Sequence, residues 1–299
     1  MKNPLLVQIK TEDGLTLPGT LFEARGNKKA AIHLHGNGSS SVFYTRNQRP
    51  EQVEALNQKG ISFLLFNNRG AQYIHKLDVE KNGEVERKRF GMAYELIKDC
   101  VKDIDAAINL LEKLGYKEFY LIGESTGANK ICVYHYYRPN NKVSKYLMIG
   151  GGDDTGIYYD ILGKETFFTL LKEAKEKIRK GQGEEIICEI LPDNIFSYQG
   201  FYDIANPDGD YNTFPFLEVM KNLKLSKKPL FRYYKSINKP TLVIYGENDE
   251  YAWENASEMV QILKRQKPEF EYQVIKDGDH SLTGHQKGLA KLIMDWLIN

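Results

Sequence analysis

Short apolar runs alternate with segments of helical periodicity along most of this chain. Leu5–Lys10 and Leu15–Glu23 flank the turn Thr11–Gly14, and this pattern predicts a β-hairpin. Further strands are predicted at six apolar runs: Lys29–His35, Ile61–Phe66, Phe119–Ile122, Val143–Ile149, Pro240–Gly246 and Phe270–Ile275. Between them, apolar positions at helical spacing predict helices at Glu51–Lys59, at Ile97–Leu111 with an end near Gly115, at Ala256–Arg265, and at Leu289–Leu297.

Repeated strand–helix units of this length imply an α/β fold, in which a mostly parallel central sheet is covered by helices on both faces. The alternation stops after Gly150-Gly-Gly152 and resumes at Pro240. We therefore expect a core domain formed by 1–152 and 239–299, with a mainly helical segment inserted at 153–238. In such sheets the chemistry gathers at the carboxyl ends of the strands.

Composition narrows the possible partners. The 299 residues include 41 basic and 40 acidic side chains, so a net charge of +1 gives no reason to expect nucleic acid or an anionic membrane as a partner. No apolar run approaches the ~20 residues of a membrane span, and the amino-terminal segment lacks the apolar run of a signal peptide. The three scattered cysteines, Cys100, Cys132 and Cys188, suit small core residues in a reducing compartment. These features predict a soluble, cytoplasmic protein.

Candidate chemistry begins at Gly123-Glu-Ser-Thr-Gly127, which fits G-x-S-x-G between a predicted strand and a predicted helix. A serine on such a sharp turn projects its hydroxyl above the end of the sheet. The two glycines keep side chains out of the space where strand and helix nearly touch. Ser125 is therefore the candidate nucleophile.

A serine nucleophile needs a general base, and the chain has six histidines. Only His280 lies late in the chain, in a loop after the last predicted strand. His35 is its main rival, although the glycines beside it suit another task. The other four histidines lie inside predicted elements or in a polar loop: His33, His75, His135 and His285.

The base in turn needs a carboxylate that fixes its tautomer. Asp249 lies a few residues past the end of the predicted strand Pro240–Gly246 and is the candidate. Glu247 and Glu250 compete in the same loop, whereas Asp279 directly precedes His280 and is badly placed to bond its ring.

An oxyanion needs two N–H donors. The backbone N–H of Thr126 follows the nucleophile, and the N–H of Asn37 lies in the glycine loop after the strand that ends at His35. No metal-ligand spacing is visible, and no cofactor is implied.

The order Ser125…Asp249…His280, with Gly123–Gly127 and His35–Gly38 at strand ends, resembles the α/β-hydrolase superfamily. The insertion after Gly152 falls where that superfamily commonly carries its lid. Within the superfamily, the chain is similar to bacterial hydrolases related to the family that includes fungal siderophore esterases. Three segments carry this narrower similarity: Phe66–Gly70, Asp99–Ile104 and Ser125–Gly127. Relatives often have His where Glu124 stands.

The resemblance and the residues together indicate a serine esterase, a carboxylic-ester hydrolase that takes a small-molecule ester. A peptidase or amidase with the same triad, and a hydrolase-fold binding protein without turnover, remain alternatives. The aromatic residues between Phe196 and Phe216 either form an acyl or aryl pocket or pack the lid onto the body. Asn68 and Arg69 either contact a polar substrate group or brace their loop.

Overall fold

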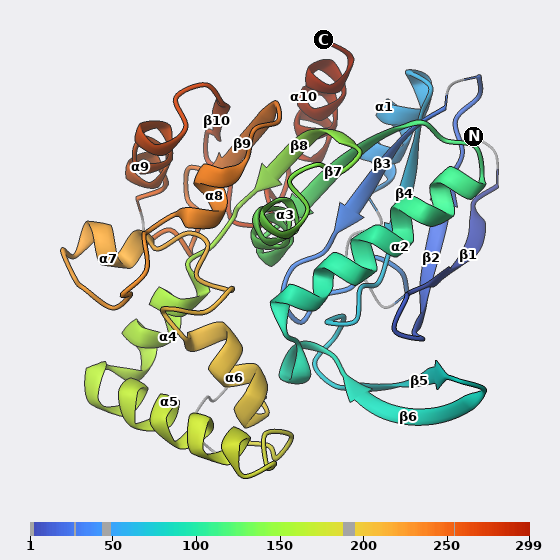
Figure 1. Ribbon diagram of the computed structural model, residues 1–299. Coiled ribbons are helices and arrows are strands. Elements are labelled where there is room, and N and C mark those ends of the chain that lie inside the picture. The colour runs from blue at the N-terminus through green and yellow to red at the C-terminus, as the bar shows by residue number, and fades with distance from the viewer. Residues whose placement is uncertain (1–2, 27, 44–48, 188–194, 254) are drawn as a thin grey trace.

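The computed structural model describes residues 3–26, 28–43, 49–187, 195–253 and 255–299. Within these residues, eight strands form one sheet in the order β1-β2-β4-β3-β7-β8-β9-β10, and two more form a separate ribbon (Figure 1). The strands are β1 (Leu5–Lys10), β2 (Thr16–Phe22), β3 (Lys29–Leu34), β4 (Ile61–Phe66), β5 (His75–Lys81), β6 (Glu84–Phe90), β7 (Glu118–Glu124), β8 (Val143–Ile149), β9 (Thr241–Gly246) and β10 (Glu271–Ile275).

The sheet is mixed but mostly parallel. β1 pairs with β2, and β2 with β4, in antiparallel fashion. All remaining neighbouring pairs, from β4 across to β10, are parallel. The predicted hairpin is confirmed, with Leu5 opposite Leu21 and Lys10 opposite Thr16. The predicted fold class is therefore confirmed.

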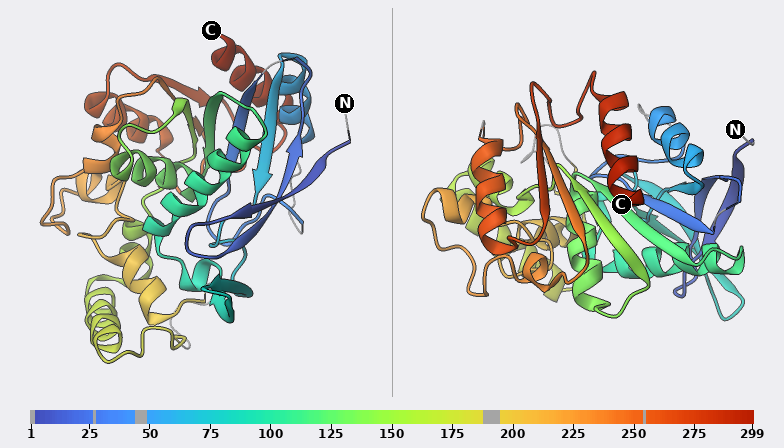
Figure 2. Two further views of the ribbon diagram at one scale, coloured as in Figure 1. Left: turned by 45° about the vertical axis from the view of Figure 1, so that its right-hand side comes forward. Right: turned by 90° about the horizontal axis from the view of Figure 1, so that it is seen from above.

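Helices cover both faces of the sheet (Figure 2). α1 and α10 pack together in the apolar core of one face, while α2, α3 and α9 contribute to the core of the other. No described helix is long and apolar enough to cross a membrane. The α-helices are α1 (Pro50–Gln58), α2 (Cys100–Lys113), α3 (Thr126–Tyr137), α4 (Asp154–Leu162), α5 (Lys164–Arg179), α6 (Tyr198–Ala205), α7 (Phe216–Met220), α8 (Arg232–Ser236), α9 (Ala256–Gln266) and α10 (Gln286–Ile298).

The strands and helices form where hydrophobic periodicity places them. β4 and β9 are buried along their whole length, which is why both are continuous apolar runs. α2 buries Ile104, Ile108 and Leu111 along one stripe. It ends before Gly115, whose φ of +87° continues the chain in the left-handed region, as predicted.

The ribbon of β5 and β6 was not predicted. β5 and β6 pair in antiparallel fashion from His75↔Phe90 to Lys81↔Glu84. Most of their side chains are exposed, but Leu77 and Val79 alternate with polar residues and pack, partly buried, against the core, a strand signal that the sequence analysis missed. The turn at Asn82-Gly83 has positive φ at both residues, which is the usual signature of a tight hairpin.

Residues 153–238 hold α4 to α8; α4, α5 and α6 lie at the lower left of Figure 1, whereas α8 packs against α3 just before the start of β9. α5 buries Phe167, Leu171 and Ala174 on one side, but Phe168 is exposed. The run 185–191 lies partly outside the described residues, and Cys188 lies outside them as well. Cys100 and Cys132 are free and buried.

Asn68 and Arg69, for which the sequence left two roles open, brace their loop. Arg69 donates through Nε and Nη2 to Asp103 at 2.9 and 2.7 Å, and through Nη1 to Asp13 at 2.8 Å. Its side chain is 6% exposed and that of Asp103 only 1%. Asn68 is also buried and accepts from Gly70 N–H and from Lys130 Nζ. The loop after β4 is thereby fixed to α2 and to the β1–β2 turn.

We expect Asp103→Ala to lower the free energy of unfolding by about 3–5 kcal/mol, because it leaves the Arg69 guanidinium buried without its main partner. Urea denaturation measures the change. Glu112→Ala on the same helix is the control. Its pair with Lys142 is exposed, so its loss should cost about 1 kcal/mol or less. Equal losses in the two variants would contradict this account of the loop.

Candidate active site

Ser125 occupies a strained turn between β7 and α3. Its backbone has φ 55° and ψ −127°, a conformation that side chains other than glycine rarely adopt. Two hydrogen bonds hold the turn: Ser125 N–H donates to Ile149 O, and Ala128 N–H donates to Ser125 O, both at 2.8 Å. A serine held against its conformational preference in this way is a signal of function rather than of packing.

The two glycines of the motif are required because neighbouring backbone atoms come too close to leave room for a side chain. A Cβ on Gly127 would lie 2.1 Å from Leu34 O, and a Cβ on Gly123 would lie 2.3 Å from Gly127 O. No side chain fits in either position. The predicted role of the two glycines is therefore confirmed, and α3 starts directly against the ends of β3 and β7.

His280 is held by Asp249. Its Nδ1 lies 2.9 Å from both carboxylate oxygens of Asp249, which is 2% exposed. Burial lowers the pKa of His280, but the hydrogen bond to Asp249 and the charge of that carboxylate together outweigh burial, so the pKa is raised above its usual 6.5. With Nδ1 donating to the carboxylate, Nε2 is left as the ring nitrogen that can exchange a proton with a substrate or nucleophile.

The competing acids contact other groups. Glu250 accepts from His280 N–H at 3.0 Å, Glu247 accepts from Asp277 N–H, and Asp279 accepts from Thr283 N–H. Among the acids weighed from the sequence, Asp249 is thus the one that contacts the imidazole.

Ser125 and His280 line the same cavity, which has a volume of about 680 Å³. Both also lie against one short segment at the end of β8. Ser125 N–H bonds Ile149 O, and a Cβ on Gly150 would lie 3.1 Å from His280 Cε1. The described hydrogen bonds include none between the serine hydroxyl and the imidazole, although such bonds often tighten only when substrate is bound.

Asn37 lines the same cavity, in a loop that lies against the serine. A Cβ on Gly36 would lie 2.8 Å from Ser125 Cβ, so only glycine lets the loop come this near. Among the described backbone bonds, none has the N–H of Asn37 or Thr126 as donor. These N–H groups are the two that were predicted to bind an oxyanion.

His35, the rival base, supports this loop instead. Its Nε2 accepts from Asn68 N–H at 3.2 Å, so Nδ1 carries the proton and donates to Gly36 O at 2.9 Å. Burial lowers the pKa of His35 well below 6.5, and the ring stays neutral. A buried, neutral histidine with both nitrogens engaged is a positioning residue.

Sequence reasoning missed a charged cluster beside the nucleophile. Glu124 accepts from Arg49 Nη2 at 2.5 Å and lies 3.4 Å from His33 Nε2. Burial raises the pKa of Glu124, but Arg49 and His33 lower it more, so this carboxylate is ionised. No spacing signal could have found the cluster, because Arg49 is 75 residues away in the chain.

The aromatic residues between Phe196 and Phe216 do not line the described cavity, so of the two alternatives left open for them the structure favours packing. They pack the inserted segment. Phe214 and Phe216 stack with ring centroids 5.8 Å apart, and Phe196 and Phe201 are buried around Tyr158. From residues 153–238, the cavity lining comes from α4, through Asp154, Ile157, Tyr158 and Ile161.

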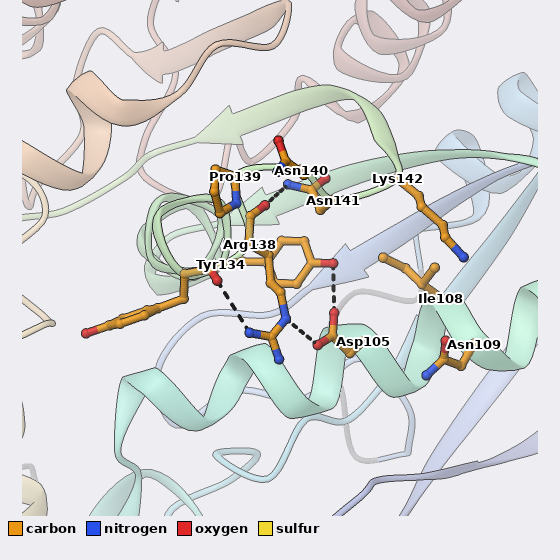
Figure 3. A pocket seen from close by; sticks show the side chains of 10 residues that line it. Asp105, Ile108, Asn109, Tyr134, Arg138, Pro139, Asn140, Asn141 and Lys142 are labelled. Carbon is orange, nitrogen blue, oxygen red and sulfur yellow. Dashed lines mark hydrogen bonds and ion pairs between the residues drawn. The ribbon is translucent and has the colours of Figure 1, made fainter.

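A second pocket of about 370 Å³ lies between α2 and the turn after α3 (Figure 3). There Arg138 Nε and Tyr134 OH both donate to Asp105. Its described lining contains no serine, cysteine or histidine, so it offers no nucleophile and base. Elsewhere too, no group of three or more His, Cys, Asp or Glu side chains among the described residues could hold a metal ion.

The sheet order and the turn at Ser125 define a protein of the α/β-hydrolase fold. Residues 90–299 match the family described as "Protein of unknown function (DUF1749)", and because the match covers more than half of the chain, the protein belongs to this family. The narrower similarity to siderophore esterases stays a prediction.

Comparison with known proteins supports the same class. The chain is 27% identical over 241 residues to monoacylglycerol lipase ABHD6 of Mus musculus, a match that covers 75% of this chain and 68% of that protein. Its fold resembles Est1E from Butyrivibrio proteoclasticus with bound ferulic acid (TM-score 0.63, 14% identity, 98% of each chain). It also resembles the α/β-hydrolase GrgF from Penicillium sp. sh18 (TM-score 0.61, 17% identity, 99% of this chain and 96% of that one). The protein is therefore distantly related to lipases and shares the fold of esterases.

We expect Asp249→Asn to lower the pKa of His280, because the hydrogen bond and the charge that oppose burial most strongly would be lost, while Glu250 and Asp154 would still raise this pKa. An NMR titration of the ring protons, assigned with His280→Gln, measures this pKa. Glu250→Gln is the control, since Glu250 contacts the backbone of His280 rather than its ring. If Glu250→Gln lowered the pKa of His280 more than Asp249→Asn did, Glu250 rather than Asp249 would be the main support of the imidazolium.

Proposed function

We propose that the protein is a serine esterase that cleaves small carboxylic esters through an acyl-enzyme on Ser125. One observation carries the proposal: an imidazole held by a buried carboxylate lines the same cavity as a serine on a strained turn at the sheet end. This combination supplies a nucleophile, a base and an orienting acid.

In the proposed reaction, His280 Nε2 takes the proton of the Ser125 hydroxyl as Oγ attacks the ester carbonyl. The N–H groups of Asn37 and Thr126 bind the oxyanion, at the positive end of the α3 dipole. The tetrahedral intermediate expels the alcohol, which receives the proton from His280. A water molecule, deprotonated by the same ring, then releases the acid and restores Ser125.

The comparisons support an ester as substrate. A distant relative is named as a monoacylglycerol lipase, and a protein of the same fold binds ferulic acid. The cavity of about 680 Å³ is within the range of small-molecule sites. Residues 153–238 act as a cap in this proposal, with Ile157 and Ile161 of α4 facing the acyl chain.

We expect Ser125→Ala to lower kcat/KM for p-nitrophenyl butyrate by at least about 1,000-fold, because no other group would form the acyl-enzyme. Release of nitrophenolate measures the rate. Ser281→Ala removes another cavity-lining hydroxyl and is the matched control, with an expected change under about threefold.

Wild-type turnover no faster than that of Ser125→Ala would sink the esterase proposal. Faster cleavage of aminoacyl anilides than of esters would favour a peptidase or amidase instead. Failure of Ser125 to react with a fluorophosphonate in folded protein would favour a binding protein without turnover.

We expect Ile161→Asp to lower the ratio of kcat/KM for octanoate over acetate esters by about tenfold, since burial contributes ~0.8 kcal/mol per CH₂ and a carboxylate would oppose it. Parallel assays of the two p-nitrophenyl esters measure the ratio. Phe168→Asp is the control, because Phe168 is also exposed but does not line the cavity. An unchanged ratio in Ile161→Asp would place the acyl chain elsewhere.

A further inference from the structure

Asp154 is a cavity carboxylate that the proposed reaction does not use. It is the first residue of α4 and lines the cavity together with Ser125 and His280. Its Oδ2 is out of contact with solvent and has no hydrogen-bond partner in the described part of the chain. A buried acceptor without a partner is costly, which points to a missing ligand.

Neighbouring carboxylates are satisfied. Glu124 binds Arg49, and Asp249 binds His280. Asp153, the residue before Asp154, accepts from Gly156 N–H at 2.7 Å and from Leu217 N–H at 2.8 Å. Of these four acids, described with all their bonds, only Asp154 has no donor. Its function is therefore not to cap α4 or to hold another side chain.

Three tyrosines line the cavity together with this carboxylate. Tyr158 lies one turn further along α4 and lines the cavity, as do Tyr73 and Tyr251. The Tyr251 ring packs edge-on against His280, with centroids 4.6 Å apart. Burial first, and then the charge of Asp154, raises the pKa of Tyr158 well above its usual value, so the two groups are electrostatically close.

The electrostatics of the free site favour a cation. Burial, reinforced by the charge of Asp153, raises the pKa of Asp154 to about 7. A positive ligand would reverse this shift and give the carboxylate a hydrogen-bond donor. The ring faces of tyrosine side chains also attract cations. A neutral hydroxyl on the ligand would bond the carboxylate but would gain nothing from the rings.

We propose that Asp154 binds a protonated amine of the substrate, beside the rings of Tyr158 and Tyr251, so that the protein prefers esters that carry an amino group. The preference in ester cleavage rests on the proposed esterase function. The preference in binding can be measured without turnover.

Binding is measured by calorimetry on Ser125→Ala, which keeps Asp154 intact. 2-(Dimethylamino)ethyl butyrate and 3-methylbutyl butyrate differ only by N–H⁺ in place of C–H in the alcohol. Ethyl 4-(dimethylamino)butyrate and ethyl 5-methylhexanoate make the same comparison in the acyl group. We expect the amine ester of at least one pair to bind at least about tenfold more tightly, and Asp154→Asn added to Ser125→Ala to abolish the difference.

Kinetics give the second measurement. In the protein with Ser125 present, Asp154→Asn should lower kcat/KM for the preferred amine ester at least about tenfold more than for its neutral isostere. Asp160→Asn makes the same substitution on the same helix, outside the cavity, and should lower both equally or not at all.

Equal affinity within both pairs overturns the proposal, and so does equal loss on both esters in Asp154→Asn. A preference for 2-hydroxyethyl butyrate over propyl butyrate without any preference for the amine esters also overturns it in favour of a hydroxyl. If the wild-type protein cleaves none of these esters, the esterase function fails, while calorimetry still decides whether Asp154 binds the amine.

Discussion

The close approach of α3 to the end of β3 is the constraint on which the candidate site depends. Leu34 O occupies the space where a Cβ on Gly127 would stand, so the helix starts against the sheet with no side chain between them. This contact forces Ser125 into a left-handed conformation and presents it beside the loop at Gly36. Ser125 and the loop at Gly36 are therefore positioned by backbone packing, and groups held by packed elements are placed more precisely than groups on free loops.

Buried charges hold the loops around this contact. Lys130 on α3 is fully buried and bonds Glu95 at 2.7 Å and Asn68 Oδ1 at 3.2 Å. Asn68 N–H in turn donates to His35, which binds the carbonyl of Gly36. Because breaking one member would leave the others buried without partners, the network ties α3 to the loops after β3 and β4. Lys130, Asn68 and His35 thus fix the loops on which the candidate site is built.

Hydrophobic pattern predicted the sheet and its helices well, because it reports which residues are buried. The contact of His280 with Asp249 was predictable from chain order and strand ends, since parallel strands bring their following loops to one edge. The ribbon of β5 and β6 was missed, although Leu77, Val79 and the Asn82-Gly83 turn give a weak hairpin signal, because most of its side chains are exposed. Nor were Arg49 and Asp154, whose significance depends on which distant residues pack beside them.

The aromatic residues of the inserted segment illustrate the same limit and decide how the cavity is walled. Composition left open whether they form a pocket or pack the segment, and Phe214 packs against Gly151, where a Cβ would lie 2.8 Å from its ring. Tyr245 OH of β9 donates to Gly151 O at 2.5 Å. Phe214 thus packs the segment at the carboxyl end of β8, while α4 lines the cavity. In the proposed function, selectivity depends on the side chains that α4 contributes to this lining: Asp154, Ile157, Tyr158 and Ile161.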